Sequence, residues 1–121
     1  MPNKTILIVD DSRMSRMLIR AMVAQLRPDW TIVEAVSGDD ALAKVDELKP
    51  DFVSMDVNMP GIGGMEAAGR IRMHHPAIRI ALCTANIQES IQQGAARNGL
   101  YFVKKPITEA GIAEMIAAFE G

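Results

Sequence analysis

The chain has 121 residues, a formal net charge of −2 and a single cysteine. This length predicts one domain, residues 1–121, with one hydrophobic core and no second sizeable module. The slightly negative charge and the scattered lysines and arginines argue against direct nucleic-acid binding, because phosphate backbones are bound through clustered basic side chains. One cysteine excludes an internal disulfide bond and favours a reducing compartment.

The N-terminal residues lead directly into the first predicted strand, without the apolar segment of a secretion signal. No apolar run approaches the ~20 residues that a membrane-spanning helix needs. We therefore expect a soluble, cytoplasmic protein without a membrane partner.

Strand-like and helix-like patterns alternate along the chain. Short apolar runs predict strands near residues 5–10, 31–35, 52–56, 78–83 and 100–104. Amphipathic patterns predict helices near residues 13–27, 38–48, 65–74, 87–97 and 109–119. The strands are apolar at consecutive positions, as is typical of strands buried on both faces of a parallel sheet. The alternation predicts an α/β fold, with a five-stranded parallel sheet that is doubly wound by helices on both faces.

The helix termini carry capping signals of unequal strength. Ser12 and Ser37 are the predicted N-caps of the first two helices. The fourth predicted helix has a thin apolar stripe, Ile87, Ile91 and Ala95. We expect this helix to be the least firmly packed of the five.

Three carboxylates follow two of the predicted strands directly. The run Ile6–Val9 leads into Asp10 and Asp11, and the run Phe52–Met55 leads into Asp56. In open α/β sheets, ligands bind outside the carboxyl ends of the strands, where these acids would gather. Three acids would repel one another unless protons or a cation neutralised them. Oxygen-only ligands suit Mg²⁺, which also binds phosphate oxygens.

A lysine, Lys105, follows the last predicted strand. Three carboxylates, one ammonium group and one divalent cation sum to zero charge, so a phosphoryl group could enter without a large excess charge. Taken alone, Asp10 and Asp11 after a strand are more commonly turn or N-cap residues. The whole set of strand-end residues instead predicts a metal-assisted phosphoryl site.

This set of residues resembles the receiver domain of the two-component response regulator family, the chemotaxis regulators included. The matching elements occur in order along the chain: Val9-Asp10-Asp11-Ser12, Asp56-Val57-Asn58-Met59-Pro60 with Gly64 and Glu66, Thr84-Ala85, and Lys105-Pro106. The resemblance covers essentially the whole chain. It implies a flavodoxin-like (βα)5 fold with strand order 2-1-3-4-5.

The resemblance also implies a role for each site residue. Asp56 would accept a phosphoryl group from a sensor histidine kinase or a phosphotransfer domain. Mg²⁺, with Mn²⁺ as an alternative ion, would be held by Asp10, Asp11, Asp56 and the backbone carbonyl of Asn58, with Asp10 acting largely through a metal-bound water.

Two further side chains would contact the phosphoryl group. Lys105 would pair with phosphoryl oxygens, and Thr84 would donate its hydroxyl to one of them. Lys104 is a competing lysine, but the position against Pro106 selects Lys105. The family has a cis peptide bond at the position of Lys105 and Pro106.

The resemblance also implies that Thr84 and Phe102 are the switch residues that link phosphorylation to the output of the domain. Phe102 occupies the family's aromatic switch position, where many chemotaxis regulators have tyrosine, and this difference argues against a flagellar-motor regulator. Phosphorylation would change the surface formed by the fourth helix, the fifth strand and the fifth helix. That face would bind a downstream protein or a second copy of the chain.

Two other function classes are consistent with parts of the pattern. An aspartyl-nucleophile phosphohydrolase of small phosphoesters needs a general acid near its nucleophile and a substrate cap, whereas this chain has Asn58 two residues after Asp56 and no cap-length insertion. A flavodoxin-like cofactor binder needs a glycine-rich phosphate loop after the first strand, and none is present. We therefore expect no enzyme activity beyond the chain's own phosphoryl transfer and dephosphorylation.

Overall fold

A computed structural model describes residues 3–85 and 100–121. The strands are β1 (Thr5–Val9), β2 (Thr31–Ala35), β3 (Phe52–Asp56), β4 (Arg79–Thr84) and β5 (Tyr101–Lys104). The helices are α1 (Arg13–Leu26), α2 (Gly38–Leu48), α3 (Gly64–His74) and α5 (Glu109–Glu120). The element bounds differ from the sequence predictions by one residue at several ends. The predicted helix at residues 87–97, with its thin apolar stripe, lies outside the described residues.

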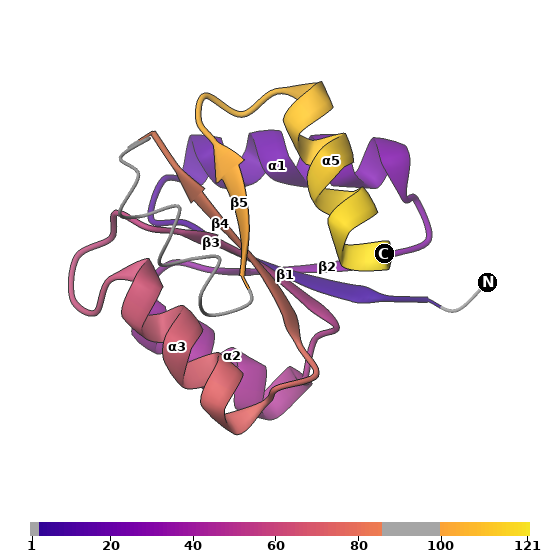
Figure 1. The fold of residues 1–121 in the computed structure, drawn as a ribbon. Coiled ribbons are helices and arrows are strands. Elements are labelled where there is room, and N and C mark those ends of the chain that lie inside the picture. The colour runs from indigo at the N-terminus through magenta and orange to yellow at the C-terminus, as the bar shows by residue number, and fades with distance from the viewer. Residues whose placement is uncertain (1–2, 86–99) are drawn as a thin grey trace.

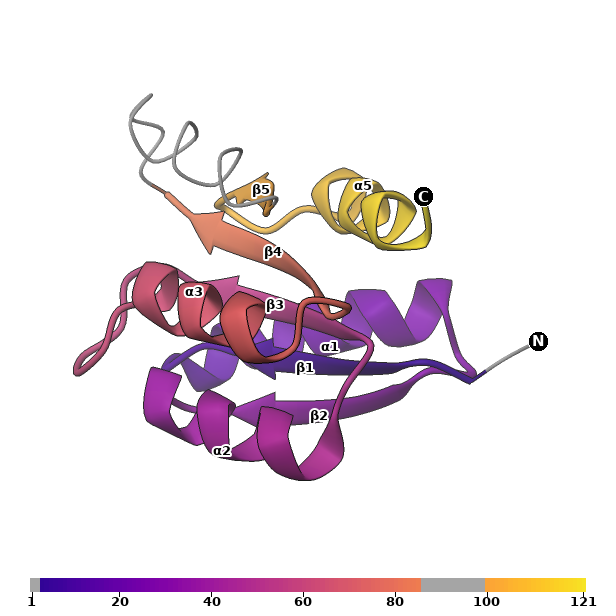
Figure 2. The ribbon, with the colours of Figure 1, turned by 60° about the horizontal axis from the view of Figure 1, so that its bottom comes forward.

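The five strands form one parallel sheet in the order β2-β1-β3-β4-β5, as the resemblance implied. Helices α1 and α5 cover one face, and α2 and α3 cover the other (Figures 1 and 2). The predicted doubly wound architecture is therefore confirmed.

Consecutive residues of the central strand β1 face opposite layers. Leu7 and Val9 belong to the core against α2 and α3, whereas Ile6 and Ile8 belong to the core against α1 and α5. All four side chains are at most 1% exposed. Because side chains alternate across a sheet, a strand covered on both faces must be apolar at every position. This requirement explains the continuous apolar run that precedes Asp10.

Capping residues and one glycine fix the connections at the carboxyl edge of the sheet. The Ser12 hydroxyl accepts from Ser15 N at the start of α1, and the Ser37 hydroxyl caps α2 in the same way. Gly64 begins α3 directly against the end of β3. A side-chain Cβ at this position would lie 2.0 Å from the carbonyl oxygen of Asp56. Only glycine allows this close approach without a shift of the backbone.

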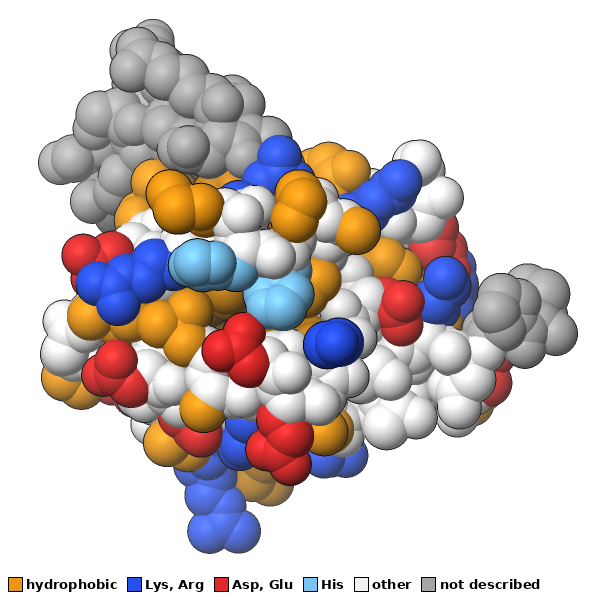
Figure 3. Space-filling model, turned by 90° about the horizontal axis from the view of Figure 1, so that it is seen from below, with side chains coloured by type: hydrophobic (Ala, Val, Ile, Leu, Met, Phe, Trp, Pro, Cys, Tyr) orange, Lys and Arg blue, Asp and Glu red, His pale blue; other side chains and the backbone are white. Residues whose placement is uncertain are grey.

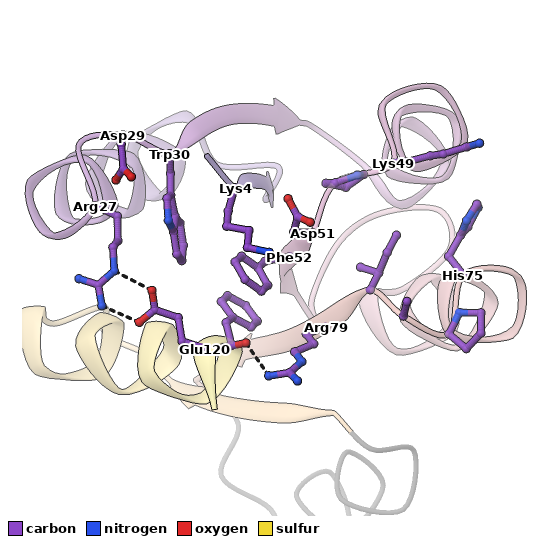
Figure 4. A pocket seen from close by; sticks show the side chains of 15 residues that line it. Lys4, Arg27, Asp29, Trp30, Lys49, Asp51, Phe52, His75, Arg79 and Glu120 are labelled. Atoms are coloured by element: carbon purple, nitrogen blue, oxygen red, sulfur yellow. Dashed lines mark hydrogen bonds and ion pairs between the residues drawn. The ribbon is translucent and has the colours of Figure 1, made fainter. Parts of the chain in front are cut away.

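The opposite edge of the sheet is closed by aromatic packing. Phe52 and Phe119 stack with ring centroids 4.7 Å apart, and Trp30 lies 5.0 Å from Phe52. These aromatic side chains line a hollow of about 1020 Å³. Figure 4 shows Trp30 and Phe52 in this hollow, with the Arg27–Glu120 ion pair on one side. These contacts join the ends of α1 and α5, and they lie at the far end of the strands from the predicted site.

The outer face of α2 and α3 carries charged side chains of both signs, with apolar side chains between them (Figure 3). His75 Nε2 lies 2.8 Å from Asp46 Oδ1 and links the two helices. None of the helices within residues 3–85 and 100–121 has the length and apolar character to cross a membrane.

Candidate functional site

The three predicted carboxylates lie together at the carboxyl edge of the sheet. Because β1 pairs with β3 in parallel, the ends of the two strands place Asp10 beside Asp56. One carboxylate oxygen from each of Asp10, Asp11 and Asp56 lies within 4.8 Å of the others. Asp10 and Asp56 are buried, whereas Asp11 is exposed. The cluster therefore opens to solvent on the side of Asp11.

Lys105 reaches this cluster from the end of β5. Its Nζ lies 3.1 Å from Asp10 Oδ2 and 3.3 Å from Asp56 Oδ1. Its backbone N–H donates to the carbonyl of Thr84, and the Lys105–Pro106 peptide bond is cis. Lys104 is exposed and forms no ion pair with the residues that the structure describes. Lys105 is therefore the lysine of the cluster.

Backbone groups orient the two buried carboxylates. Asp10 Oδ1 accepts from Ser12 N at 2.8 Å, and Asp56 Oδ1 accepts from Asn58 N at 3.3 Å. The start of α1 follows within three residues of Asp10, so the positive end of the helix dipole lies near the acids. These donors partly compensate the negative charge.

Burial and charge shift the ionisation of Asp56 and Lys105. Burial raises the pKa of Asp56, and the negative charge of Asp10 raises it further against the opposing effect of Lys105. For Lys105, burial lowers the pKa, but the contacts with Asp10 and Asp56 outweigh it and raise the pKa overall. The lysine therefore carries its positive charge at neutral pH. The raised pKa of Asp56 means that its ionised form is disfavoured, and additional positive charge nearby would stabilise that form.

The donor chemistry of the cluster fits a magnesium ion. All of its anionic donors are carboxylate oxygens, and three carboxylates with one ammonium group leave a formal charge of −2. A divalent cation would balance this charge, and Mg²⁺ prefers oxygen ligands that leave room for water. Asn58 follows Asp56 in an exposed loop, and its carbonyl stays a predicted ligand.

Comparison with known proteins identifies the family of this chain. Residues 6–117 match the family model described as the response regulator receiver domain. The chain belongs to the response regulator receiver domain family. Receiver domains accept phosphate from histidine kinases, act on downstream partners and bind Mg²⁺ at an acidic pocket. The family is one of signalling proteins rather than classical enzymes.

Several relatives align with this receiver domain over nearly its whole length. The response regulator GacA of Pseudomonas viridiflava is 39% identical over 118 residues, covering 93% of this chain and 52% of GacA. The chemotaxis protein CheY of Listeria monocytogenes is 34% identical over 113 residues, covering 92% of this chain and 93% of CheY. The chain thus spans about half the length of GacA and nearly all of CheY.

Solved structures show the same fold. The response regulator domain of Thermotoga maritima CheB is 30% identical and superimposes with a TM-score of 0.84, covering 98% of this chain and 95% of that domain. The fold expected from the sequence is therefore shared with an experimentally determined receiver domain.

The two predicted switch residues of the receiver lie on neighbouring strands. Thr84 ends β4 and is fully buried, and Phe102 lies in β5 opposite Leu82. Phe102 is half-buried, and among residues 3–85 and 100–121 it is part of neither of the two core clusters. Its role as a switch stays a prediction.

Sequence reasoning missed one residue of the site, Arg16. Its Nη1 donates to the carbonyl oxygen of Asp10 at 2.7 Å, and its Nε donates to Glu34 on β2. Glu34 is the signal that could have revealed it, because a charged residue within an otherwise apolar strand requires a partner.

Proposed function

We propose that this receiver accepts a phosphoryl group on Asp56, from the phosphohistidine of a sensor histidine kinase or of a phosphotransfer domain. The observation that carries the proposal is the convergence of Asp10, Asp11, Asp56 and Lys105 from three separate strand ends. The modified chain then signals through a changed binding surface, in the cytoplasm where its kinase presents the donor.

The chemistry assigned to Asp56 is an in-line displacement. A carboxylate oxygen attacks phosphorus, the bond from phosphorus to the donor imidazole nitrogen breaks, and an acyl phosphate remains on the receiver. Lys105 holds phosphoryl oxygens through its ammonium group, and the Thr84 hydroxyl donates to another. Bound at Asp10, Asp11, Asp56 and the Asn58 carbonyl, Mg²⁺ supplies charge neutralisation for the incoming phosphoryl oxygens.

Exposed apolar side chains on α1 support a docking site for the phosphodonor. Met14, Met17 and Leu18 are 73%, 59% and 46% exposed, and their spacing places them on one stripe of the helix. The stripe begins three residues after Asp11. Contiguous exposed apolar side chains commonly mark a protein interaction surface. The face formed by β5, α5 and the predicted fourth helix is the proposed output surface for a downstream protein or a second copy.

Incubation with acetyl phosphate and Mg²⁺, followed by intact mass spectrometry, tests the proposal. The parent protein should gain one labile phosphoryl group, and Asp56→Asn should gain none. Asp29→Asn is the matched control, because it removes an exposed carboxylate at the opposite edge of the sheet. Labelling of the Asp56→Asn protein at the parent's rate would refute the assignment, and turnover of added phosphoesters would favour the phosphohydrolase alternative.

A further inference from the structure

Arg16, near the start of α1, contacts the backbone of the acidic site rather than its carboxylates. Its Nη1 donates to Asp10 O at 2.7 Å, and its Nε donates to Glu34 Oε1 at 2.9 Å. The Arg16 side chain is only 13% exposed. The guanidinium group therefore ties β2 to the loop that carries Asp10 and Asp11.

Glu34 holds this guanidinium group in place. The Glu34 carboxylate also accepts from Arg20 Nε at 2.8 Å, so its two oxygens bind two different arginines. The hydrogen bonds from Arg20 and Arg16 lower the pKa of Glu34, which stays ionised at neutral pH. A planar guanidinium bound at two of its nitrogens has little freedom to rotate.

The hydrogen bond from Arg16 to the Asp10 carbonyl also restrains the backbone of Asp11. The Asp10 carbonyl and the Asp11 N–H belong to one planar peptide unit, so a bond to the carbonyl restrains the orientation of the whole unit. Two further hydrogen bonds hold Asp10. Its backbone N–H donates to the carbonyl oxygen of Ala35, and its carboxylate accepts from Ser12 N. The exposed Asp11 carboxylate has no hydrogen bond or ion pair within residues 3–85 and 100–121.

We propose that Arg16, oriented by Glu34, is a positioning residue that pre-orients Asp11 for a divalent cation through the Asp10–Asp11 peptide. The inference rests on the proposed function, because it concerns cation binding at the same acidic cluster. Groups that orient metal ligands commonly contribute 10–100-fold to metal affinity.

The sign of the effect separates positioning from charge. Arg16 carries a positive charge beside the cluster, so by Coulomb's law alone its removal would strengthen Mg²⁺ binding. Positioning requires the opposite, a loss of affinity, because Asp11 would sample more orientations in the free protein. Arg16→Gln therefore distinguishes the two effects directly.

The experiment is a Mg²⁺ titration of the metal-free protein, followed through backbone amide chemical shifts. Arg16→Gln should raise the Kd for Mg²⁺ roughly tenfold. Arg20→Gln is the matched control, since it removes the same charge and another Glu34 partner but leaves the Asp10 carbonyl contact. Its Kd should equal the parent's or fall slightly. Arg16→Lys keeps the charge and should give an intermediate Kd.

A second measurement needs no metal. The amide shift of Asp11 in the free protein should move in Arg16→Gln, because the Asp10 carbonyl loses its donor, and should stay unchanged in Arg20→Gln. Equal or tighter Mg²⁺ binding by Arg16→Gln, or by Arg16→Lys if the glutamine variant does not fold, would overturn the inference.

The two proposals can fail separately. Phosphorylation of Asp56 in the parent together with unchanged Mg²⁺ affinity in Arg16→Gln would overturn the positioning role alone. Absence of Mg²⁺ binding in the parent would overturn both the positioning role and the metal dependence of the proposed function.

Discussion

Lys105 Nζ lies 3.3 Å from Asp56 Oδ1, although 49 residues separate the two positions in the chain. Strand β4 lies between β3 and β5 in the sheet, so the lysine side chain reaches across one strand to meet the carboxylate. The same ammonium group lies 3.1 Å from Asp10 Oδ2. Lys105 therefore contacts both buried carboxylates, and in the proposed function it would detect a phosphoryl group on Asp56 while the carboxylates bind the cation.

This geometry predicts that Lys105→Ala still allows phosphorylation of Asp56 but uncouples it from the output surface. In the proposed function, Asp56 and the metal would supply the chemistry, and the lysine would hold the phosphoryl oxygens. Intact mass spectrometry measures phosphorylation of Asp56. Beryllofluoride mimics the phosphoryl group, so amide spectra recorded with and without it measure the coupling to the output surface. Lys104→Ala is the matched control and should behave like the parent. Parent-like spectral changes in Lys105→Ala would show that Lys105 is not the coupling group.

Phosphorylation is predicted to move Thr84 and Phe102 together. A phosphoryl oxygen should draw the Thr84 hydroxyl toward Asp56, and the Phe102 ring should occupy the vacated space by a rotamer change. Such a shift changes the populations of existing states. Phe102→Tyr should favour the outward ring, because the inward position would bury a hydroxyl group.

Beryllofluoride titration of both proteins tests this switch. Amide and side-chain signals of Phe102 and neighbouring β5 residues should shift in the parent, and the shift should be smaller in Phe102→Tyr. Perturbations confined to Asp11, Asp56 and Lys105 in the parent would contradict the switch.

The Arg27–Glu120 pair predicts a pH-dependent contribution to stability. Arg27 Nε and Nη2 contact the two Glu120 oxygens at 2.8 and 2.6 Å, and the hydrogen bond from Arg27 lowers the pKa of Glu120 below its usual value of 4.5. A lowered folded-state pKa means that the stabilisation is present above the unfolded pKa and is lost as pH falls through the folded pKa. Glu120→Gln should therefore reduce the free energy of unfolding at pH 7 by about 0.5 kcal/mol.

Urea unfolding at a series of pH values checks this prediction. The deficit of Glu120→Gln relative to the parent should narrow as the pH falls below about 4.5. Glu114→Gln makes the same charge change at an exposed position of α5 and should show little deficit at any pH. A Glu120→Gln deficit that does not change with pH would mean that the ion pair is not its source.

The apolar stripe on α1 predicts a variant that separates donor docking from chemistry. Met17→Asp should slow phosphoryl transfer from a histidine kinase or phosphotransfer domain by about fivefold or more, because a charge would have to be buried in the interface. Labelling by acetyl phosphate should be unchanged, since this small donor needs no docking surface. Met73→Asp, at an exposed methionine on α3, is the control. Equal slowing with both donors would argue against docking on α1.

The sequence by itself predicted the element order, the parallel sheet and the gathering of Asp10, Asp11 and Asp56. These features follow from local patterns. A strand buried on both faces must be apolar throughout, and parallel strands deliver the residues that follow them to one edge. The strand order was accessible only through the resemblance to receiver domains, because hydrophobic periodicity does not state which strands are neighbours.

The tertiary structure alone decided the contacts that cross between elements. Arg16 and Glu34 are separated by 18 residues, and the direction of both side chains depends on how α1 packs against β2. The stack of Phe52 on Phe119 likewise depends on α5 lying over the amino edge of the sheet. Such contacts depend on long-range packing rather than on local sequence preference. The charged Glu34 in β2 indicates that it needs a partner, but only the placement of the helix against the sheet shows that this partner is Arg16 and that Arg16 also holds the Asp10 carbonyl.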